Sequence, residues 1–356
     1  MARAAVRTSA LGPHQRIELI SVAPPVQSFI WCCFFVTQGF PRPKHPAAET
    51  GSVARPSRVF SVDVYRTPDD RFRDLPGYPY EPHYFEWEGL RLHYLDEGSG
   101  PPILLLHGEP DWSYLYRRMV PILAARFRVV APDYAGFGRS DKPTGIEWYT
   151  YDRHVASVAA LIEHLDLGGM TLVVQDWGGP IGLRAAVEAR ERFAGLVVMN
   201  TGLFVDADWP TPGFLRWRAF AERTGLDLPV GRVMQASVVR PLDEATLAAY
   251  EAPWPVRESK AGVAAFPLLV PVSDDHPAAI VLRRVAHELT TWRVPALVAW
   301  SDQDPVFTPE HGQAMAEALP GAGGVWVVEG AGHMLQEDRG EAIAERIVGW
   351  LDRLHG

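Results

Sequence analysis

The chain has 356 residues, of which 47% are hydrophobic and 22% are charged, and its formal net charge is −9. This length allows one large α/β domain with an inserted subdomain, or two ordinary domains. The acidic balance, and the lack of a Lys/Arg cluster interleaved with aromatic residues, argue against nucleic acid and anionic membranes as partners. The only cysteines, Cys32 and Cys33, are adjacent, so they form neither a disulfide framework nor a cysteine-based metal site.

Residues 1–60 differ from the rest because they are rich in Ala, Pro, Ser and Arg around one apolar patch, residues 29–36. Eight helical residues span about 12 Å, far less than a hydrocarbon core of about 30 Å, so the patch is no membrane span. We expect a disordered extension, or upstream sequence translated from a misplaced start, on a cytoplasmic protein. Secretion is the alternative, since Arg3, Arg7 and Arg16 precede the patch, but this approach is long and contains Glu18, Pro24 and Pro25.

From Tyr65 onward, short apolar runs alternate with helical segments. The sequence predicts a hairpin within 84–95 and strands at 103–106, 128–132, 170–174, 195–199, 296–300 and 324–328. It predicts helices at 115–125, 151–165, 181–190 and 341–354. This alternation predicts an α/β fold with a mostly parallel, doubly wound sheet.

No buried-strand run interrupts residues 201–292, which are rich in helix formers, Pro and Trp. A strandless stretch of this length inside an alternating sheet predicts an inserted helical cap. The sheet domain then has two parts, residues 61–200 and 293–356. Because ligands of such sheets bind at the carboxyl ends of the strands, we expect the cap to close the site there and exclude water.

The segment 173–179 places Asp176 at the apex of a strand–turn–helix, which is the context of a nucleophile elbow. A serine is expected there in an esterase. An aspartate is already ionised near neutral pH, so it can displace a leaving group from saturated carbon and form an ester with the substrate. The alternative interpretation is a helix-capping aspartate beside packing glycines.

A second motif, residues 107–110, follows the strand at 103–106. In this architecture that position supplies one backbone N–H of an oxyanion hole, here that of Glu109. The other N–H comes from Trp177, the residue after the nucleophile. Taken alone, residues 107–110 are also compatible with a tight turn.

His333 lies among small residues just after the last strand, and we expect it to be the base. The order nucleophile, acid, histidine is that of the α/β-hydrolase fold. Asp302 and Asp304 both follow the strand at 296–300, so either could be the acid. We expect Asp304 to orient the imidazole of His333 and Asp302 to cap the turn.

From about Tyr65 to the C-terminus, the chain resembles the haloalkane dehalogenases of the α/β-hydrolase superfamily, and among them the subfamily typified by the Xanthobacter dichloroethane-degrading enzyme. The matching segments are residues 66–69, 107–110, 112–116, 136–143 and 173–179. In that subfamily the acid occupies the position that matches Asp304. Other subfamilies place it after the strand at 195–199, where this chain has Asn200.

The leaving halide needs hydrogen-bond donors in a dry pocket, and an indole N–H is a donor only. Trp177 is the first donor. Related subfamilies take the second donor from an Asn after His-Gly, where this chain has Glu109, whose charged side chain could only repel halide. The resemblance therefore implies that Trp217, in the cap segment 213–217, is the second donor, with Trp209 and Trp254 as fallback candidates.

The resemblance also implies that the pocket wall contains Phe214, Phe266, Pro267 and Val270. It implies a monomer that takes a small haloalkane and water and releases alcohol and halide, with no metal or other cofactor. Asp176 would be alkylated, and His333 would activate the water that hydrolyses the ester.

Three rival functions remain open at this point. An epoxide hydrolase needs two acidic O–H donors in the cap, but Tyr250 is the only tyrosine between residues 200 and 293. A haloacetate dehalogenase needs cationic groups for the substrate carboxylate, and its matching motifs differ. A non-catalytic binding protein of this fold would not need Asp176, Asp304 and His333 together.

Overall fold

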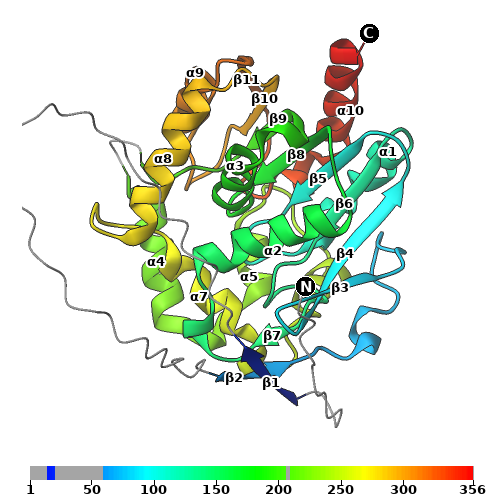
Figure 1. The fold of residues 1–356 in the computed structure, drawn as a ribbon, viewed down its shortest axis with the longest axis vertical. Coiled ribbons are helices and arrows are strands. Elements are labelled where there is room, and N and C mark those ends of the chain that lie inside the picture. The colour runs from blue at the N-terminus through cyan, green and yellow to red at the C-terminus, as the bar shows by residue number, and fades with distance from the viewer. Residues whose placement is uncertain (1–13, 21–58, 206–208, 356) are drawn as a thin grey trace, which may run out of the picture.

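The computed structural model describes residues 14–20, 59–205 and 209–355, and the strands of these segments form two sheets (Figure 1). The larger sheet has eight strands in the order β11-β10-β9-β8-β5-β6-β4-β3. Neighbouring strands from β11 to β6 are parallel, whereas β4 is antiparallel to both β6 and β3. These strands are β3 His83–Trp87, β4 Leu90–Gly98, β5 Pro102–Leu106, β6 Arg128–Pro132, β8 Met170–Gln175, β9 Phe193–Met199, β10 Ala296–Ser301 and β11 Ala322–Val328.

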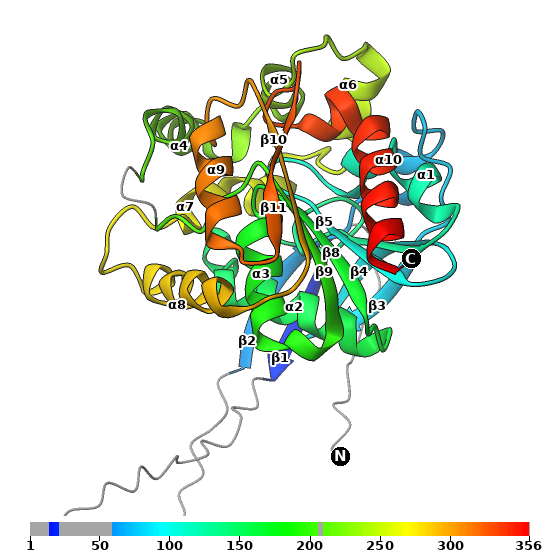
Figure 2. The same ribbon diagram turned by 90° about the horizontal axis from the view of Figure 1, so that it is seen from above.

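Helices cover both faces of this sheet, as Figure 2 shows, with α1 and α10 on one side and α2, α3, α8 and α9 on the other. Strands buried on both faces are expected to be continuous apolar runs, and every residue of β8 is buried. The helices are α1 Val120–Ala124, α2 Tyr151–His164, α3 Gly178–Glu188, α4 Pro212–Thr224, α5 Val230–Ala236, α6 Glu244–Glu251, α7 Ala261–Leu269, α8 Pro277–Thr291, α9 Pro309–Ala318 and α10 Leu335–His355. The predicted doubly wound, mostly parallel sheet is therefore confirmed.

Two predicted helices differ from those observed. Instead of one helix at 115–125, a 3-10 turn at Ser113–Tyr116 precedes α1, because Pro121 lacks an N–H and can occupy only the first turn of a helix. The C-terminal helix begins six residues before the predicted 341, at Leu335, and is kinked at Arg339, where φ is −141°.

The smaller sheet contains β1 His14–Ile20, β2 Val59–Tyr65 and β7 Lys142–Pro143. β1 lies inside the segment expected to be a disordered extension, and it pairs with β2 in antiparallel register. The apolar patch at 29–36 and both cysteines lie outside the described residues. Among the helices that the structure describes, none is long and apolar enough to cross a membrane.

Between β9 and β10, the described residues form the helices α4 to α8 and no strand. α4 and α7 lie side by side in this insertion (Figure 1). The side chains of α4, α5 and α7 share one cavity with Asp176, at the carboxyl end of β8. The insertion therefore covers the edge of the sheet where ligands of such folds bind.

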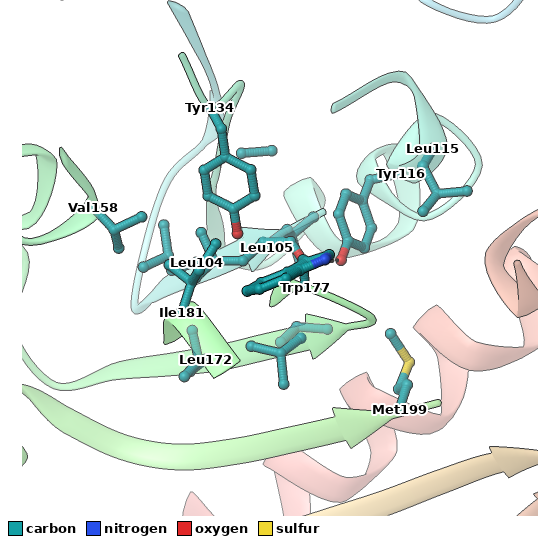
Figure 3. Packing of buried hydrophobic residues seen from close by; sticks show 14 of the residues in the cluster. Leu104, Leu105, Leu115, Tyr116, Tyr134, Val158, Leu172, Trp177, Ile181 and Met199 are labelled. Atoms are coloured by element: carbon teal, nitrogen blue, oxygen red, sulfur yellow. Dashed lines mark hydrogen bonds between the residues drawn. The ribbon is translucent and has the colours of Figure 1, made fainter. Parts of the chain in front are cut away.

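The core of the larger sheet continues up to this edge. Figure 3 shows the ring of Trp177 lying among Leu105, Tyr116 and Tyr134, above the strands. Trp177 is 4% exposed, and the Tyr116 hydroxyl donates a hydrogen bond of 2.7 Å to the carbonyl of Leu106. The floor of the cavity is thus part of the packed core.

Candidate active site

Asp176 forms the turn between β8 and α3, and its φ of +48° is a left-handed conformation that is rare outside glycine. The surrounding backbone holds this turn. The N–H of Asp176 donates to the carbonyl of Asn200 (3.0 Å), and the carbonyl of Asp176 accepts from the Thr201 hydroxyl (2.5 Å) and the Gly179 N–H (3.0 Å). The sequence therefore folds here into a strained elbow that presents the carboxylate to the cavity.

Glycines allow the close approaches that this elbow requires. A Cβ at Gly108 would lie 2.5 Å from Asp176 Oδ1, and a Cβ at Gly179 would lie 1.9 Å from the Thr201 hydroxyl oxygen. Both distances are too short for any side chain.

One backbone N–H contacts the carboxylate, and a second belongs to the residue that follows Asp176. The Glu109 N–H donates to Asp176 Oδ1 at 2.8 Å. The N–H of Trp177 belongs to the residue that precedes α3, where the helix dipole favours negative charge. Both residues expected to form an oxyanion hole are thus neighbours of the predicted nucleophile, Glu109 through this hydrogen bond and Trp177 in the sequence.

His333 lies between two carboxylates. Its Nε2 is 3.6 Å from Asp176 Oδ2, and its Nδ1 is 2.7 Å from Asp304 Oδ2. The other oxygen of Asp304 accepts the N–H groups of Val306 (2.7 Å) and Phe307 (3.0 Å). Asp302 is exposed and accepts backbone N–H groups, among them that of Ala331 at 3.2 Å, so Asp304 is the aspartate that contacts the histidine.

Asn200 and Gln175 fix the loop that carries His333. The Asn200 amide donates to the carbonyls of Gly332 (3.1 Å) and His333 (3.0 Å), and its oxygen accepts the Ser301 N–H at 3.0 Å. Gln175 donates to the same His333 carbonyl at 3.2 Å. Sequence reasoning treated Asn200 only as a missing acid, because nothing local to it indicates these distant backbone partners.

The charges of the site shift two pKa values upward. Burial lowers the pKa of His333, but the charges of Asp304 and Asp176 and hydrogen bonds to both outweigh it, so the pKa lies well above the ordinary 6.5. Burial, reinforced by the charge of Asp176, raises the pKa of Glu109 well above 4.5. Burial thus disfavours the charged form of Glu109, which weakens the halide repulsion expected from its sequence position.

The cavity beside Asp176 has a volume of about 100 Å³. Phe214 and Trp217 are three residues apart on α4 and both line the cavity, as residues at this spacing share one helix face. Pro267 and Val270 also line it. Phe266, expected in the wall, does not, because α7 buries it behind Trp177 with their ring centroids 5.1 Å apart.

The four tryptophans considered as halide donors differ in the acceptors of their indole N–H groups. That of Trp209 donates to the carbonyl of Pro271, and that of Trp254 to the carbonyl of Gly136, each at 3.0 Å. Trp177 and Trp217 line the cavity, and no residue in the described segments accepts a hydrogen bond from either indole. Of the four, only these two line the cavity with an indole N–H that has no acceptor among the described residues.

Sequence reasoning missed much of the rest of the wall. It contains Phe204, Val233, Ala236, Ser237, Pro305, Val306 and Phe307. Phe307 stacks on the imidazole of His333 with a centroid distance of 5.9 Å. In the sequence, only the prediction of Asp304 as the acid indicated that the segment containing Phe307 lies near the site. Within the described part of the chain, no group of three or more His, Cys, Asp or Glu residues is arranged to hold a metal ion.

Comparisons with known proteins agree with this geometry. Residues 101–340 match the family model of the α/β hydrolase fold. A haloalkane dehalogenase from Mycobacterium marinum is 48% identical over 299 residues, which cover 81% of this chain and 100% of the relative. One from Psychrobacter cryohalolentis is 44% identical over 300 residues, 82% of this chain and 98% of the relative.

Solved structures show the same relationship. A tetrameric haloalkane dehalogenase from Paraglaciecola agarilytica NO2 superposes with a TM-score of 0.75 at 38% identity, covering 80% of this chain and 97% of its own. One from Bradyrhizobium elkanii has a TM-score of 0.69 at 28% identity, covering 77% and 98%. With its elbow aspartate, buried histidine and inserted cap, this chain belongs to the haloalkane dehalogenases.

Proposed function

We propose that the protein hydrolyses small haloalkanes to an alcohol, a halide ion and a proton through an alkyl ester on Asp176. The observation that carries this proposal is the pair of uncommitted indole N–H groups, those of Trp177 and Trp217, in one cavity with an elbow carboxylate. Donors without an acceptor function fit a leaving halide, which is an anion that accepts hydrogen bonds and has no proton to donate.

In the first step, Asp176 attacks the carbon that bears the halogen, a C–O bond forms, and the C–halogen bond breaks. The halide leaves with the bonding electrons, and the indole N–H groups of Trp177 and Trp217 stabilise its charge as it develops. The apolar side chains of Phe214, Pro267 and Val270 hold the alkyl group and keep water from competing.

In the second step, His333 takes a proton from water, and the hydroxide attacks the carboxyl carbon of the ester. The N–H groups of Glu109 and Trp177 stabilise the resulting oxyanion. Its collapse breaks the bond to the alkoxide, which takes the proton back from His333 and leaves as the alcohol, and the carboxylic acid of Asp176 then loses its proton to solvent. Esterification removes the negative charge of Asp176, so the pKa of His333 falls from its raised value, which allows the imidazole to accept the proton.

We further propose that the chain belongs to the subfamily of the Xanthobacter enzyme. The contact between Asp304 and His333 and the cavity position of Trp217 support this assignment. A cavity of about 100 Å³ favours a short alkyl chain. The monomeric state and the cytoplasmic location stay predictions, and light scattering on the purified protein tests the first against the tetramer described for the Paraglaciecola relative.

A His333→Gln variant tests the two-step scheme. It should still release halide once from 1-bromobutane or 1,2-dibromoethane and then stop, because alkylation needs no base and hydrolysis does. Intact-protein mass spectrometry should show the added alkyl group. An Asp176→Ala, His333→Gln double variant should gain no mass. Absence of the adduct in an inactive His333→Gln protein would disprove the scheme.

The position of Tyr250 weighs against epoxide hydrolysis. Its hydroxyl donates to the carboxylate of Glu337, its ring is fully buried, and it does not line the cavity. The cap therefore offers no tyrosine hydroxyl to an opening epoxide. An epoxide panel assayed beside the haloalkane panel should give no turnover.

A further inference from the structure

Asp338, in the first turn of α10, is a buried carboxylate that no step above uses. It accepts three backbone N–H groups, those of Val239 (3.0 Å), Arg240 (2.9 Å) and Gly332 (2.9 Å). Hydrogen bonds to a charged acceptor are about twice as strong as neutral ones, so the carboxylate holds these groups together firmly.

The three N–H groups belong to two segments that are far apart in the sequence. Val239 and Arg240 lie in the link between α5 and α6 of the cap. Gly332 directly precedes His333. The carboxylate of Asp338 therefore joins the cap to the loop that carries the proposed base.

Direct backbone contacts reinforce this junction. The N–H of Met334, the residue after His333, donates to the carbonyl of Ser237 at 3.0 Å. A Cβ at Gly332 would lie 2.7 Å from that same carbonyl oxygen, so the two backbones leave no room for a side chain. Ser237 itself lines the cavity. These contacts fix the position of the pocket wall relative to the loop that carries His333.

We propose that Asp338 is a positioning residue that couples the cap to His333. By fixing Gly332 against the α5–α6 link, it holds the imidazole where it can take the proton from water. The inference rests on the proposed function, because His333 acts only in hydrolysis of the ester. Loss of Asp338 should therefore slow the second step and leave halide release in the first turnover near the wild-type rate.

Rapid-quench measurement of bromide release from 1-bromobutane separates the two steps. In Asp338→Ala, the burst of bromide should persist while the steady-state rate falls by roughly 10- to 100-fold, since a displacement of about 1 Å can cost about 100-fold. Alkylated enzyme should accumulate and be visible by mass. Asp338→Asn, which keeps the shape and one acceptor oxygen, should show the same split to a smaller degree and guards against misfolding of the alanine variant.

Glu337→Gln is the matched control. Glu337 is a buried carboxylate in the same turn, and it also ties the cap to the core, through Tyr250 and Arg117 (3.0 Å). Among the described residues, its carboxylate is hydrogen-bonded to neither the α5–α6 link nor the histidine loop, and its backbone N–H, which donates to the carbonyl of Met334 at 2.9 Å, is kept in the variant. This variant should lower the melting temperature and keep the wild-type ratio of burst to steady-state rate.

The proposal is overturned if the Asp338 variants keep the wild-type ratio of burst amplitude to steady-state rate. This includes the case in which both quantities fall in equal proportion, as partial unfolding of Glu337→Gln would cause. Failure of the proposed function has a different signature. In that case the wild-type protein would release no bromide, or the His333→Gln variant would form no ester.

Discussion

The two sides of the cavity are built differently. On the sheet side, Asp176, Asp304 and His333 are each held by hydrogen bonds between backbone and side chain or by a buried carboxylate. On the cap side, Trp217 is half-buried, has no hydrogen bond within the described residues, and is held by packing against neighbours such as Phe220, whose ring centroid is 6.1 Å away. The groups proposed to form and break the ester are fixed, and the halide donor that the cap contributes, Trp217, depends on packing.

Because of this difference, substitutions on the two sides of the cavity should affect activity in different ways. The hydrogen-bonded residues of the sheet side should tolerate few substitutions, because removal of one partner of a buried hydrogen bond leaves the other group unsatisfied. On the cap side, where side chains are held by packing, a substitution changes the shape of the cavity wall gradually. Substitutions on the sheet side should abolish a step, whereas substitutions in the cap should shift the preferred leaving group or chain length.

The largest effect is expected for Asp304→Asn. Because Oδ1 of Asp304 accepts two backbone N–H groups, the carbonyl of an asparagine would stay there and turn its amide NH₂ towards Nδ1 of His333. The imidazole would then carry its proton on Nε2 and could not accept one from water. Steady-state turnover should fall on the order of 10⁴-fold, as it does when the analogous carboxylate is neutralised in serine proteases.

Asp302→Asn is the control for this substitution. Asp302 is exposed and accepts backbone N–H groups, among them that of Ala331, which an asparagine oxygen also can. Its turnover should stay near that of the wild type. Equal losses in the two variants would show that the sheet side is not built around Asp304, and the comparison between the two sides would fail.

A smaller effect is expected in the cap, for Trp217→Phe. The substitution keeps an aromatic wall and removes one N–H donor, so kcat/KM should fall by roughly 100-fold. Chloroalkanes should lose more than iodoalkanes, because chloride concentrates its charge in a smaller ion. Halide release measured across a chloro, bromo and iodo series checks both statements.

Trp209→Phe separates donation from packing. The Trp209 indole already donates to Pro271, and its ring packs on Phe214 with centroids 4.7 Å apart. This variant should lose about 1 kcal/mol of stability through the unsatisfied carbonyl and keep the wild-type halogen order. A changed halogen order in Trp209→Phe alone would move the halide site away from Trp217.

The same contrast explains what the sequence could predict. β8 and β10 are recognisable as apolar runs, and Asp176 and Asp304 stand directly after them, so local pattern locates the sheet side of the site. Trp217 has no such local signal, and only the resemblance to a family singled it out. Cap helices are amphipathic like any others, and which face meets the cavity is decided by tertiary packing.

Residues that act through distant backbone atoms were beyond sequence reasoning. Asn200 and Asp338 are hydrogen-bonded to backbone N–H and C=O groups, which nearly every residue possesses, so no residue type marks their partners. Phe266 was misplaced for a related reason. Its hydrophobicity fits a cavity wall and a buried core equally well, and the packing of α7 on Trp177 decided between them.

The smallest effect is expected at Glu109, where the two sides of the cavity meet. Its buried side chain contains an Oε1 without a hydrogen-bond partner among the described residues, and burial and Asp176 raise its pKa above 4.5. Since the folded-state pKa is the higher one, the stability contributed by this carboxyl is present below pH 4.5 and is lost as the pH rises through the raised pKa.

Glu109→Gln keeps the backbone N–H and removes this titration. The variant should therefore melt higher than the wild type at neutral and alkaline pH, and the difference should shrink as the pH falls towards 4.5. Melting curves of both proteins across this pH range measure that difference in melting temperature. The titration of groups that both proteins contain affects both alike and largely cancels. A difference that stays constant with pH, or that grows on acidification, would mean that Glu109 is ionised in the folded protein. The cavity would then present a negative charge to the leaving halide, and Trp217 would have to overcome it.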